Sequence, residues 1–441
     1  HVTIAGLVFI GGCLLLYLQA MVQHRSFFPK AHDEFAYLIQ MQMVARGHLW
    51  YPKHALADFF DSFQILIDPV YAPMYFPGQA MLYAPVVWFG LPPWVLPLIV
   101  SGVCMMMMYI VFTSLFDRTT GIVAALLLLS IGEFRRVSIE LFAHLPSLLF
   151  GLLMIRGYLR WRESDRKIPW TLWIGAFAGW GAITRPLDAL MYAAPVGALM
   201  SLELLQCGSG REREEAKERR NAKAEFTSLS SSRTFAPSRL RVVFSCLLSI
   251  ILGAAPFLTL QAIFNHKVSG SIFTTPFNVY AHRDFPMTSY GFHDYDSSQR
   301  PKSILPQKQS YHDDMTVKLV KEHTVGGAWD RLINGMMPAT LRYNLPQELL
   351  IILMPLGALA LHDPKRAALF AVWPLFLGLY FFYTFFLSRY VVPIAPAIIL
   401  LIVGAIAVLP RFRAVIIVFI ASLSITSLPS VNRFVSDELF E

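Results

Sequence analysis

The sequence has 441 residues, of which 55% are hydrophobic and only 15% are charged. Soluble globular domains carry about 25% charged residues, so this composition excludes an ordinary soluble protein. Apolar segments near the length of about 20 residues that a bilayer-spanning helix needs recur from end to end. The net charge of +8 lies largely in short loops between these segments, as in cytoplasmic loops of membrane proteins. It therefore does not indicate nucleic-acid binding.

Taken in chain order, the apolar segments predict an all-α polytopic membrane protein with about eleven transmembrane helices. The first segment lacks a small-residue cleavage site, so we interpret it as an uncleaved span. The predicted spans are 3–23, 93–116, 119–131, 142–160, 170–183, 187–205, 242–264, 349–361, 367–387, 391–409 and 414–428. Segment 78–90 is too short to span and contains Pro85, which predicts an interfacial juxtamembrane helix.

Loop charge predicts the orientation of these spans. With segment 78–90 at the surface, every loop that falls on one side carries Lys or Arg: 118, 160–167, 207–241, 365–366 and 411–413. The positive-inside rule then predicts a cytoplasmic N-terminus and a C-terminus on the opposite, outer side, with Arg135 and Arg136 as the exceptions. The segment 208–233 mixes charges of both signs, which predicts a solvated or disordered cytoplasmic linker.

Two long loops, 24–92 and 265–346, fall on the outer side, and we expect the chemistry there. The chain thus divides into a membrane module that includes the first loop (1–264), the second outer loop (265–346) and the C-terminal transmembrane helices (347–441). No P-loop, dinucleotide-binding or nucleophile-elbow motif occurs, which argues against ATP-driven transport and lipase chemistry.

Four places carry side chains that suit chemistry at the outer edge of the membrane. Asp33 and Glu34 open a predicted helix after the first span. Asp33 is interpreted either as a helix cap or as a general base or cation ligand. His144, with Glu140 one turn earlier, begins the fourth predicted span. Its imidazole is either structural or part of a pocket that faces the bundle.

Arginines supply the other two places. Arg185 precedes Asp188 by three residues, so it is either half of a local ion pair or an anion ligand at the membrane surface. Arg389 and then Tyr390 directly precede the predicted span 391–409, and Arg389 either extends to the lipid headgroups or binds phosphate. The second outer loop adds His293, but its histidines and acids have no recognised metal-ligand spacing.

In sequence order these segments resemble the GT-C superfamily of lipid-linked-sugar glycosyltransferases. The bacterial branch akin to protein O-mannosyltransferases and the aminoarabinose transferase of lipid A is the most similar. An acidic pair after the first span is followed by "ARGHLWYP", and a proline-rich juxtamembrane segment ends in "VVWFGLP". "TRPLDAL" and, late in the chain, "SRYVVPIAPAIILLIVG" complete the pattern. The resemblance covers most of the chain.

The resemblance implies an inverting transferase in a bacterial inner membrane, with a periplasmic active site and C-terminus. It implies a polyprenyl-phosphate-linked sugar as donor, Asp33 as the catalytic carboxylate and Glu34 as its companion. It further implies that Arg185 and Arg389 bind the donor phosphate. His144 stands where relatives often carry a second acidic residue, so a divalent cation is left open, and no other cofactor is expected.

Further residues are grouped with the donor and acceptor pocket: His144, Glu140, Tyr390 and His293. A lipid, a glycan and a protein all stay open as acceptor, and membrane lipids are expected partners. Two other classes are considered. A lipid or sugar transporter or flippase would place charges mid-span and show internal repeats. A non-catalytic membrane subunit would scatter Asp33, Arg185 and Arg389 instead of bringing them together.

Overall fold

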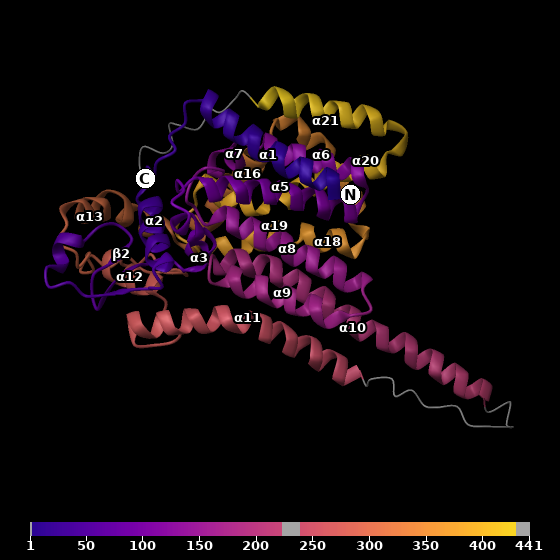
Figure 1. Ribbon diagram of the computed structural model, residues 1–441, viewed down its shortest axis with the longest axis horizontal. Helices are drawn as coiled ribbons and strands as arrows, with labels where there is room; N and C mark the ends of the chain where they lie inside the picture. Colours follow the sequence, from indigo (N-terminus) through magenta and orange to yellow (C-terminus); the bar gives the residue numbers. More distant parts are fainter. Residues whose placement is uncertain (1, 223–238, 429–441) are drawn as a thin grey trace.

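The computed structural model describes residues 2–222 and 239–428, whose helices form an elongated bundle (Figure 1). Within these ranges, six helices are long and apolar enough to cross a membrane, or up to seven if one bent pair counts as a span. They are α1 (Val2–Val22), α5 (Val95–Leu115), α10 (Pro186–Ala222), α11 (Arg239–Ser269), η6 with α20 (Ser388–Ile394 and Ala395–Val408) and η7 with α21 (Pro410–Phe412 and Arg413–Ser427). The predicted multi-pass helical membrane fold is confirmed.

Three other predicted spans also form helices: α6 (Arg118–Ser130), α8 (His144–Glu163) and α9 (Lys167–Ala182). The predicted total of eleven spans is not confirmed. Helices of 13 residues (α6) and 16 residues (α9) fall short of the roughly 20 residues that a bilayer requires. Segment 78–90 folds as two short helices, α3 (Gly78–Tyr83) and α4 (Pro85–Trp88), too short to span, as predicted.

Two predicted spans are interrupted. Segment 349–361 becomes η4 (Glu348–Leu353), α17 (Met354–Ala358) and η5 (Leu359–His362). It follows the helical stretch Val325–Asn344 at a bend of 101°. Segment 367–387 becomes α18 (Pro364–Phe370) and α19 (Val372–Tyr380). Residues 381–387 leave the helix because Arg331 binds the carbonyl groups of Tyr383 and Thr384, each at 2.7 Å. This early helix end places 381–387 beside the site described below.

The segment 208–233, predicted as a solvated or disordered linker, is helical and not disordered up to Ala222. Helix α10 continues without a break to Ala222, because the charged segment after the last apolar turn is rich in the helix formers Glu, Lys, Arg and Ala. The rest of that linker lies outside the described residues.

One end of the bundle, which we call the loop end, carries both long loops (Figure 1). The first loop contains α2 (His32–Ala45), η1 (Ala57–Phe60) and a small antiparallel sheet of β1 (Tyr51–Pro52), β3 (Val70–Pro73) and β2 (Ile65–Leu66), in that order. The second loop is more helical than its sequence indicates. It holds α12 (Pro276–Asp284), α13 (Pro306–Tyr311), η2 (His312–Thr316), α14 (Val317–Glu322), α15 (Val325–Asp330), η3 (Arg331–Met336) and α16 (Met337–Asn344).

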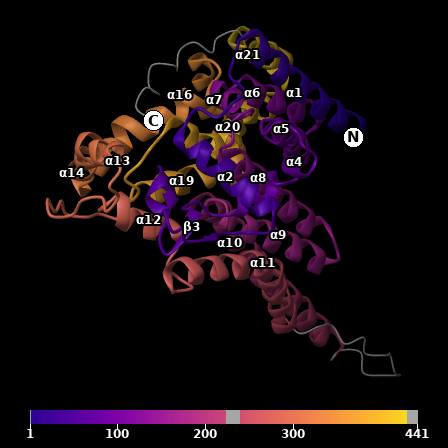
Figure 2. The same cartoon turned by 60° about the vertical axis from the view of Figure 1, so that its left-hand side comes forward.

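The two loops pack directly on each other, and α12 lies beside the sheet in both views (Figure 2). Leu66 and Val70 share an apolar cluster with Tyr280 and Phe285. The buried ammonium of Lys308 donates to Asp61 Oδ1 at 2.8 Å and to Asp284 Oδ2 at 2.6 Å. Because Asp61 belongs to the first loop and the other two residues to the second, this charge triad fixes the loops against each other.

The basic loops gather at the opposite end of the bundle. Arg413 donates to Asp117 at 2.8 Å, and Arg366 donates to the carbonyl oxygen of Leu115 at 3.1 Å. Loops from the first half and from the last fifth of the chain therefore meet there. This arrangement agrees with the separation of basic loops from long polar loops that the charge pattern predicts.

Helix α11 joins the bundle through small residues. A Cβ on Gly175 would lie 2.1 Å from the carbonyl oxygen of Ile250, and one on Gly253 would lie 2.3 Å from that of Leu172. Backbones of α9 and α11 therefore touch, as in membrane helix pairs that associate through glycine. This contact positions the helix that leads into the second loop.

Candidate active site

The site begins at the first turn of α2, where the acidic pair has two different roles. Glu34 Oε2 accepts hydrogen bonds from the backbone N–H groups of Lys30 (2.9 Å) and Ala31 (3.3 Å). Its Oε1 accepts from the N–H of Leu141 at 3.2 Å. Glu34 thus satisfies free donors at the helix start and connects α2 to the loop before α8. The interpretation of Asp33 as the cap is wrong, and the geometry assigns the buried Glu34 to holding the helix instead of to chemistry.

Replacing Glu34 by Gln is expected to lower the free energy of unfolding by about 1–3 kcal/mol, because three backbone donors lose a charged acceptor. The melting temperature of the purified protein checks this. Loss of transfer activity at an unchanged melting temperature would contradict the structural role and return Glu34 to the chemistry.

Asp33, by contrast, faces two side-chain donors. Arg389 Nη2 donates to its Oδ2 at 2.8 Å, and the phenol of Tyr75 donates to its Oδ1 at 2.5 Å. The Asp33 side chain is 24% exposed, whereas the Arg389 side chain is 3% exposed. Burial, and then the Asp33 carboxylate, raise the pKa of Tyr75 well above its usual range. The phenol therefore stays protonated as a donor.

Arg389 lies in η6, directly before the buried helix α20. Asn344 Nδ2 donates to the carbonyl oxygen of Val391 at 3.0 Å, which attaches η6 to the second loop. The guanidinium carbon of Arg389 lies 4.4 Å from the centre of the Phe142 ring, a cation–π arrangement. The interpretation of Arg389 as a residue that extends to lipid headgroups is wrong, because its side chain points into the protein to Asp33.

Arg185 forms the local ion pair that its spacing predicts. Its Nε donates to Asp188 Oδ2 at 2.7 Å, and its Nη2 donates to the phenol oxygen of Tyr380 at 2.7 Å. Tyr380 in turn donates to Asp188 Oδ1 at 2.7 Å, which closes the triad. The Arg185 guanidinium carbon also lies 4.7 Å from the centre of the Tyr390 ring, next in sequence to Arg389.

Tyrosines join the two arginine sites. The Tyr37 ring stacks on that of Tyr75 with centres 4.2 Å apart. The Tyr37 phenol interacts electrostatically with Asp33, Arg389 and Arg185. Asp33, Arg389 and Arg185, from three distant parts of the chain, therefore surround one group of tyrosine rings at the loop end. The three charged residues are therefore brought together and not scattered.

Three other predicted pocket residues differ in their surroundings. His144 stacks on Tyr390 with ring centres 5.2 Å apart, so it belongs to the cluster. Glu140 instead faces Arg25 at 3.4 Å and Arg136 at 3.7 Å.

His293 is bound within its own loop, where its Nε2 lies 2.8 Å from Ser289 Oγ. The structure thus connects His144 and Tyr390 to Asp33, and it places Glu140 in a neighbouring arginine network.

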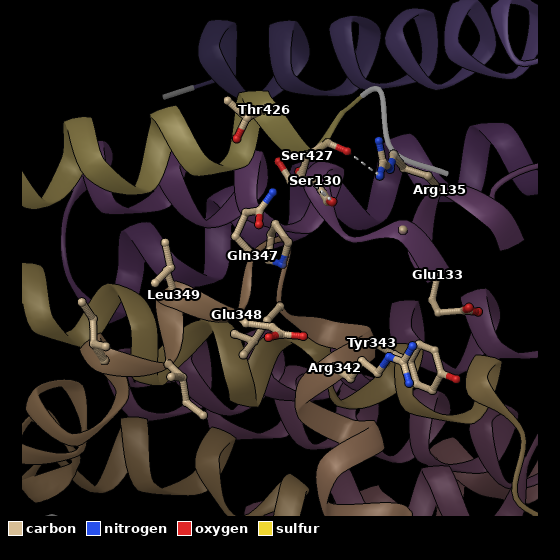
Figure 3. Close-up of a pocket in the computed structure, with 15 residues that line it drawn as sticks. Ser130, Glu133, Arg135, Arg342, Tyr343, Gln347, Glu348, Leu349, Thr426 and Ser427 are labelled. Carbon is tan, nitrogen blue, oxygen red and sulfur yellow. Dashed lines mark hydrogen bonds between the residues drawn. The ribbon is translucent and has the colours of Figure 1, made fainter. Parts of the chain in front are cut away.

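That arginine network borders a pocket of about 550 Å³ (Figure 3). Glu133 lines the pocket and accepts from Arg136 at 2.9 Å, and Arg136 reaches Ser388 Oγ at 3.5 Å. The other walls come from the bend at residues 342–352 and from the end of α21. Neither Asp33 nor the predicted phosphate ligands line this pocket, so it is distinct from the tyrosine cluster.

A divalent cation finds no suitable ligand set in the part of the chain that the structure describes, where no group of three or more His, Cys, Asp or Glu side chains comes together. Both oxygens of Asp33 accept hydrogen bonds from side chains, and those of Glu34 accept from backbone N–H groups. The acidic pair therefore does not converge on one point as metal ligands would.

Sequence reasoning missed the tyrosines. Tyr37, Tyr75, Tyr380 and Tyr383 all contribute rings near Asp33 or Tyr390. They come from α2, the segment after β3, α19 and the non-helical stretch that follows it. No spacing in the sequence marks them, because they meet only after the two loops and α19 pack together. The one available signal is the aromatic content of 14%, which is not specific to any position.

Comparisons with known proteins concern the family and the fold. Residues 91–206 match the family described as dolichyl-phosphate-mannose-protein mannosyltransferase. No curated protein matches the sequence significantly. Seven solved chains match the structure. One is the oligosaccharyltransferase of Archaeoglobus fulgidus in complex with zinc and sulfate, at 15% identity and a TM-score of 0.54. That match covers 96% of this chain and 52% of the other.

The apo form of the same archaeal enzyme matches at 13% identity and a TM-score of 0.47, over 96% of this chain and 55% of the other. The chain thus spans about half the length of the solved proteins it matches. At these identities the structural likeness shows the fold alone. The protein therefore has a membrane fold similar to that of the archaeal oligosaccharyltransferase, and its residues 91–206 match the family model described as dolichyl-phosphate-mannose-protein mannosyltransferase.

Proposed function

We propose that the protein is an inverting glycosyltransferase that moves a sugar from a polyprenyl-phosphate donor to an acceptor. In this proposal it lies in a bacterial inner membrane with its loop end in the periplasm. The observation that carries the proposal is the 2.8 Å contact between Asp33 and Arg389, which are 356 residues apart in the chain. A carboxylate, two guanidinium groups and a ring cluster at one membrane edge suit a sugar attached to a lipid phosphate.

The chemistry follows from these groups. The acceptor hydroxyl oxygen attacks the anomeric carbon while the bond from that carbon to the phosphate oxygen breaks. Asp33 accepts the hydroxyl proton, and polyprenyl phosphate leaves with the electron pair. A single displacement inverts the anomeric centre. Arginine suits phosphate because its planar fork matches two phosphate oxygens, so the leaving group needs little further protonation.

Arg389 connects donor binding to the readiness of Asp33. In the structure its guanidinium is bound to the carboxylate that the proposal uses as the base. A donor phosphate competes for the same guanidinium: as a diester it carries one negative charge, as the carboxylate does, and it offers two oxygens to the planar fork. When the phosphate takes Arg389, Asp33 Oδ2 becomes available to the acceptor, while Tyr75 keeps hold of Oδ1. The donor is therefore expected to bind before the acceptor.

Replacing Arg389 by Gln is expected to raise the KM for the donor by roughly 10- to 100-fold, because the charged bonds to phosphate are lost. Steady-state kinetics with varied donor concentration measure the change. Arg413→Gln is the matched control, since that arginine pairs with Asp117 in exposed loops at the opposite end. Equal effects of both substitutions on the donor KM would contradict the assignment of Arg389.

The proposed function itself is tested with a panel of polyprenyl-phosphate sugars. The wild-type protein, purified and reconstituted, is incubated with each donor, and the release of free polyprenyl phosphate is measured. We expect release with at least one sugar when a suitable acceptor is present. Movement of an intact lipid-linked sugar across the bilayer without release would favour a flippase instead.

A further inference from the structure

His144 is the first residue of α8, and its imidazole is almost fully buried, at 2% exposure. Neither ring nitrogen has a hydrogen-bond partner in the protein. Three histidines are buried in the described ranges, and of these only His144 has both ring nitrogens buried and without a hydrogen-bond partner. His323, for comparison, has its Nδ1 3.1 Å from Arg331. Buried polar atoms normally have partners, so packing alone does not explain a histidine here.

The surroundings of the ring point to the kind of ligand. On its face it stacks on Tyr390, at 5.2 Å and 26°, and Phe142 approaches it edge-on at 5.9 Å. The charged groups that act on it are the guanidinium groups of Arg185, Arg389 and Arg136. Burial, and then the positive charge of these arginines, favours the neutral form of the imidazole. A neutral ring presents one N–H donor and one acceptor, which is the hydrogen-bonding complement of a hydroxyl group.

His144 lies close to groups that the proposed function assigns to the donor phosphate, which are Arg185 and Arg389. Its ring stacks on that of Tyr390, and the guanidinium of Arg185 lies over the same tyrosine ring. In a glycosyl phosphate the carbon that bears the phosphate is part of the sugar ring, so the ring hydroxyls lie close to the phosphate. We propose that His144 hydrogen-bonds a hydroxyl group of the donor sugar and so determines which sugar is transferred. This inference rests on the proposed function and makes His144 a specificity residue, not the base.

The test compares His144→Phe, which keeps an aromatic ring against Tyr390 but removes both nitrogens, with His144→Gln, which keeps a donor and an acceptor. With polyprenyl-phosphate mannose as the first probe, His144→Phe is expected to raise the donor KM by about 10- to 100-fold. His144→Gln is expected to recover most of that loss. Phe150→Leu, a buried substitution further along α8, is the control that leaves the donor KM unchanged.

A panel of donors that each lack one sugar hydroxyl identifies the contact. For the analogue missing the contacted hydroxyl, wild type and His144→Phe should have the same KM, because the bond is absent in both. Melting temperatures provide a readout that separates binding from packing. Removal of two unpartnered buried nitrogens is expected to leave the melting temperature equal or higher, whereas a structural histidine would show a decrease.

An active wild type with an unchanged donor KM in His144→Phe would overturn this inference and leave the proposed function in place. If the wild-type protein released polyprenyl phosphate from no donor, both this inference and the proposed function would be rejected. Should His144→Phe fail to fold, His144→Leu with the same donor panel takes its place. A His144→Gln protein as impaired as the Phe or Leu variant would also count against a hydrogen bond from this side chain.

Discussion

Replacing Asp33 by Asn is expected to lower kcat for sugar transfer by about 100- to 10,000-fold, the usual contribution of a positioned general base. Asn preserves the shape of the side chain and can still accept the hydrogen bond from Tyr75. It cannot take the acceptor proton at neutral pH. Because the side chain is partly exposed and the bond to Arg389 lies at one edge of the cluster, the protein should still fold and bind donor. Single-turnover transfer with saturating donor measures the effect.

Glu140→Gln is the matched control for Asp33. It removes a carboxylate at the same end of the bundle, but one that faces Arg25 and Arg136 instead of the tyrosine cluster. The transfer rate of this variant should stay within a few-fold of wild type. If Asp33→Asn turned over at the wild-type rate, Asp33 would not be the base, and its bond to Arg389 would be purely structural.

The second large effect is on stability. Replacing Lys308 by Met is expected to reduce the free energy of unfolding of the loop end by about 3–5 kcal/mol, as when one partner of a buried ion pair is removed. Asp61 and Asp284 would remain as buried carboxylates, at 2% and 0% side-chain exposure, without their cation. The two long loops should then separate, and limited proteolysis within 265–346 should become faster.

Arg300→Met provides the comparison within the same loop. The ion pair of Arg300 with Asp313 is as short, at 2.7 Å, but both side chains are 51% exposed. Exposed pairs contribute little because water and salt screen them, so cleavage should proceed at the wild-type rate. If the protease cleaved Lys308→Met as slowly as wild type, apolar contacts alone would be sufficient to hold the loops together.

The transmembrane framework was predictable because it depends on local composition. Apolar length alone located α1, α5 and α20, and loop charge separated the two ends of the bundle. The interruptions were not predictable in the same way. Helix α19 ends at Tyr380, and a guanidinium from the second loop, that of Arg331, binds the carbonyl groups of Tyr383 and Thr384 that follow. Arg331 lies 52 and 53 residues before these two residues in the chain.

The site was predictable in its charged members but not in their partners. Asp33, Arg185 and Arg389 stand out because charge is rare at a membrane edge. The sequence does not show which residue of the acidic pair holds the helix start and which faces the cluster, since both lie in the first turn of α2. Only the structure shows that Glu34 accepts from backbone donors while Asp33 faces Arg389. The tyrosines carry no charge or motif, so nothing in the sequence distinguishes them from other aromatic residues.

The distance in sequence between Asp33 and Arg389 has a consequence for biosynthesis. Membrane proteins are inserted segment by segment as they leave the ribosome, so Asp33 emerges well before Arg389. The bonds of Glu34 to Lys30 and Ala31 are local, and α2 can form as soon as it emerges. Asp33 meets Arg389 only after α19 has been inserted. In the proposed function, a nascent chain therefore has no complete centre and cannot transfer sugar until Arg389 has been synthesised.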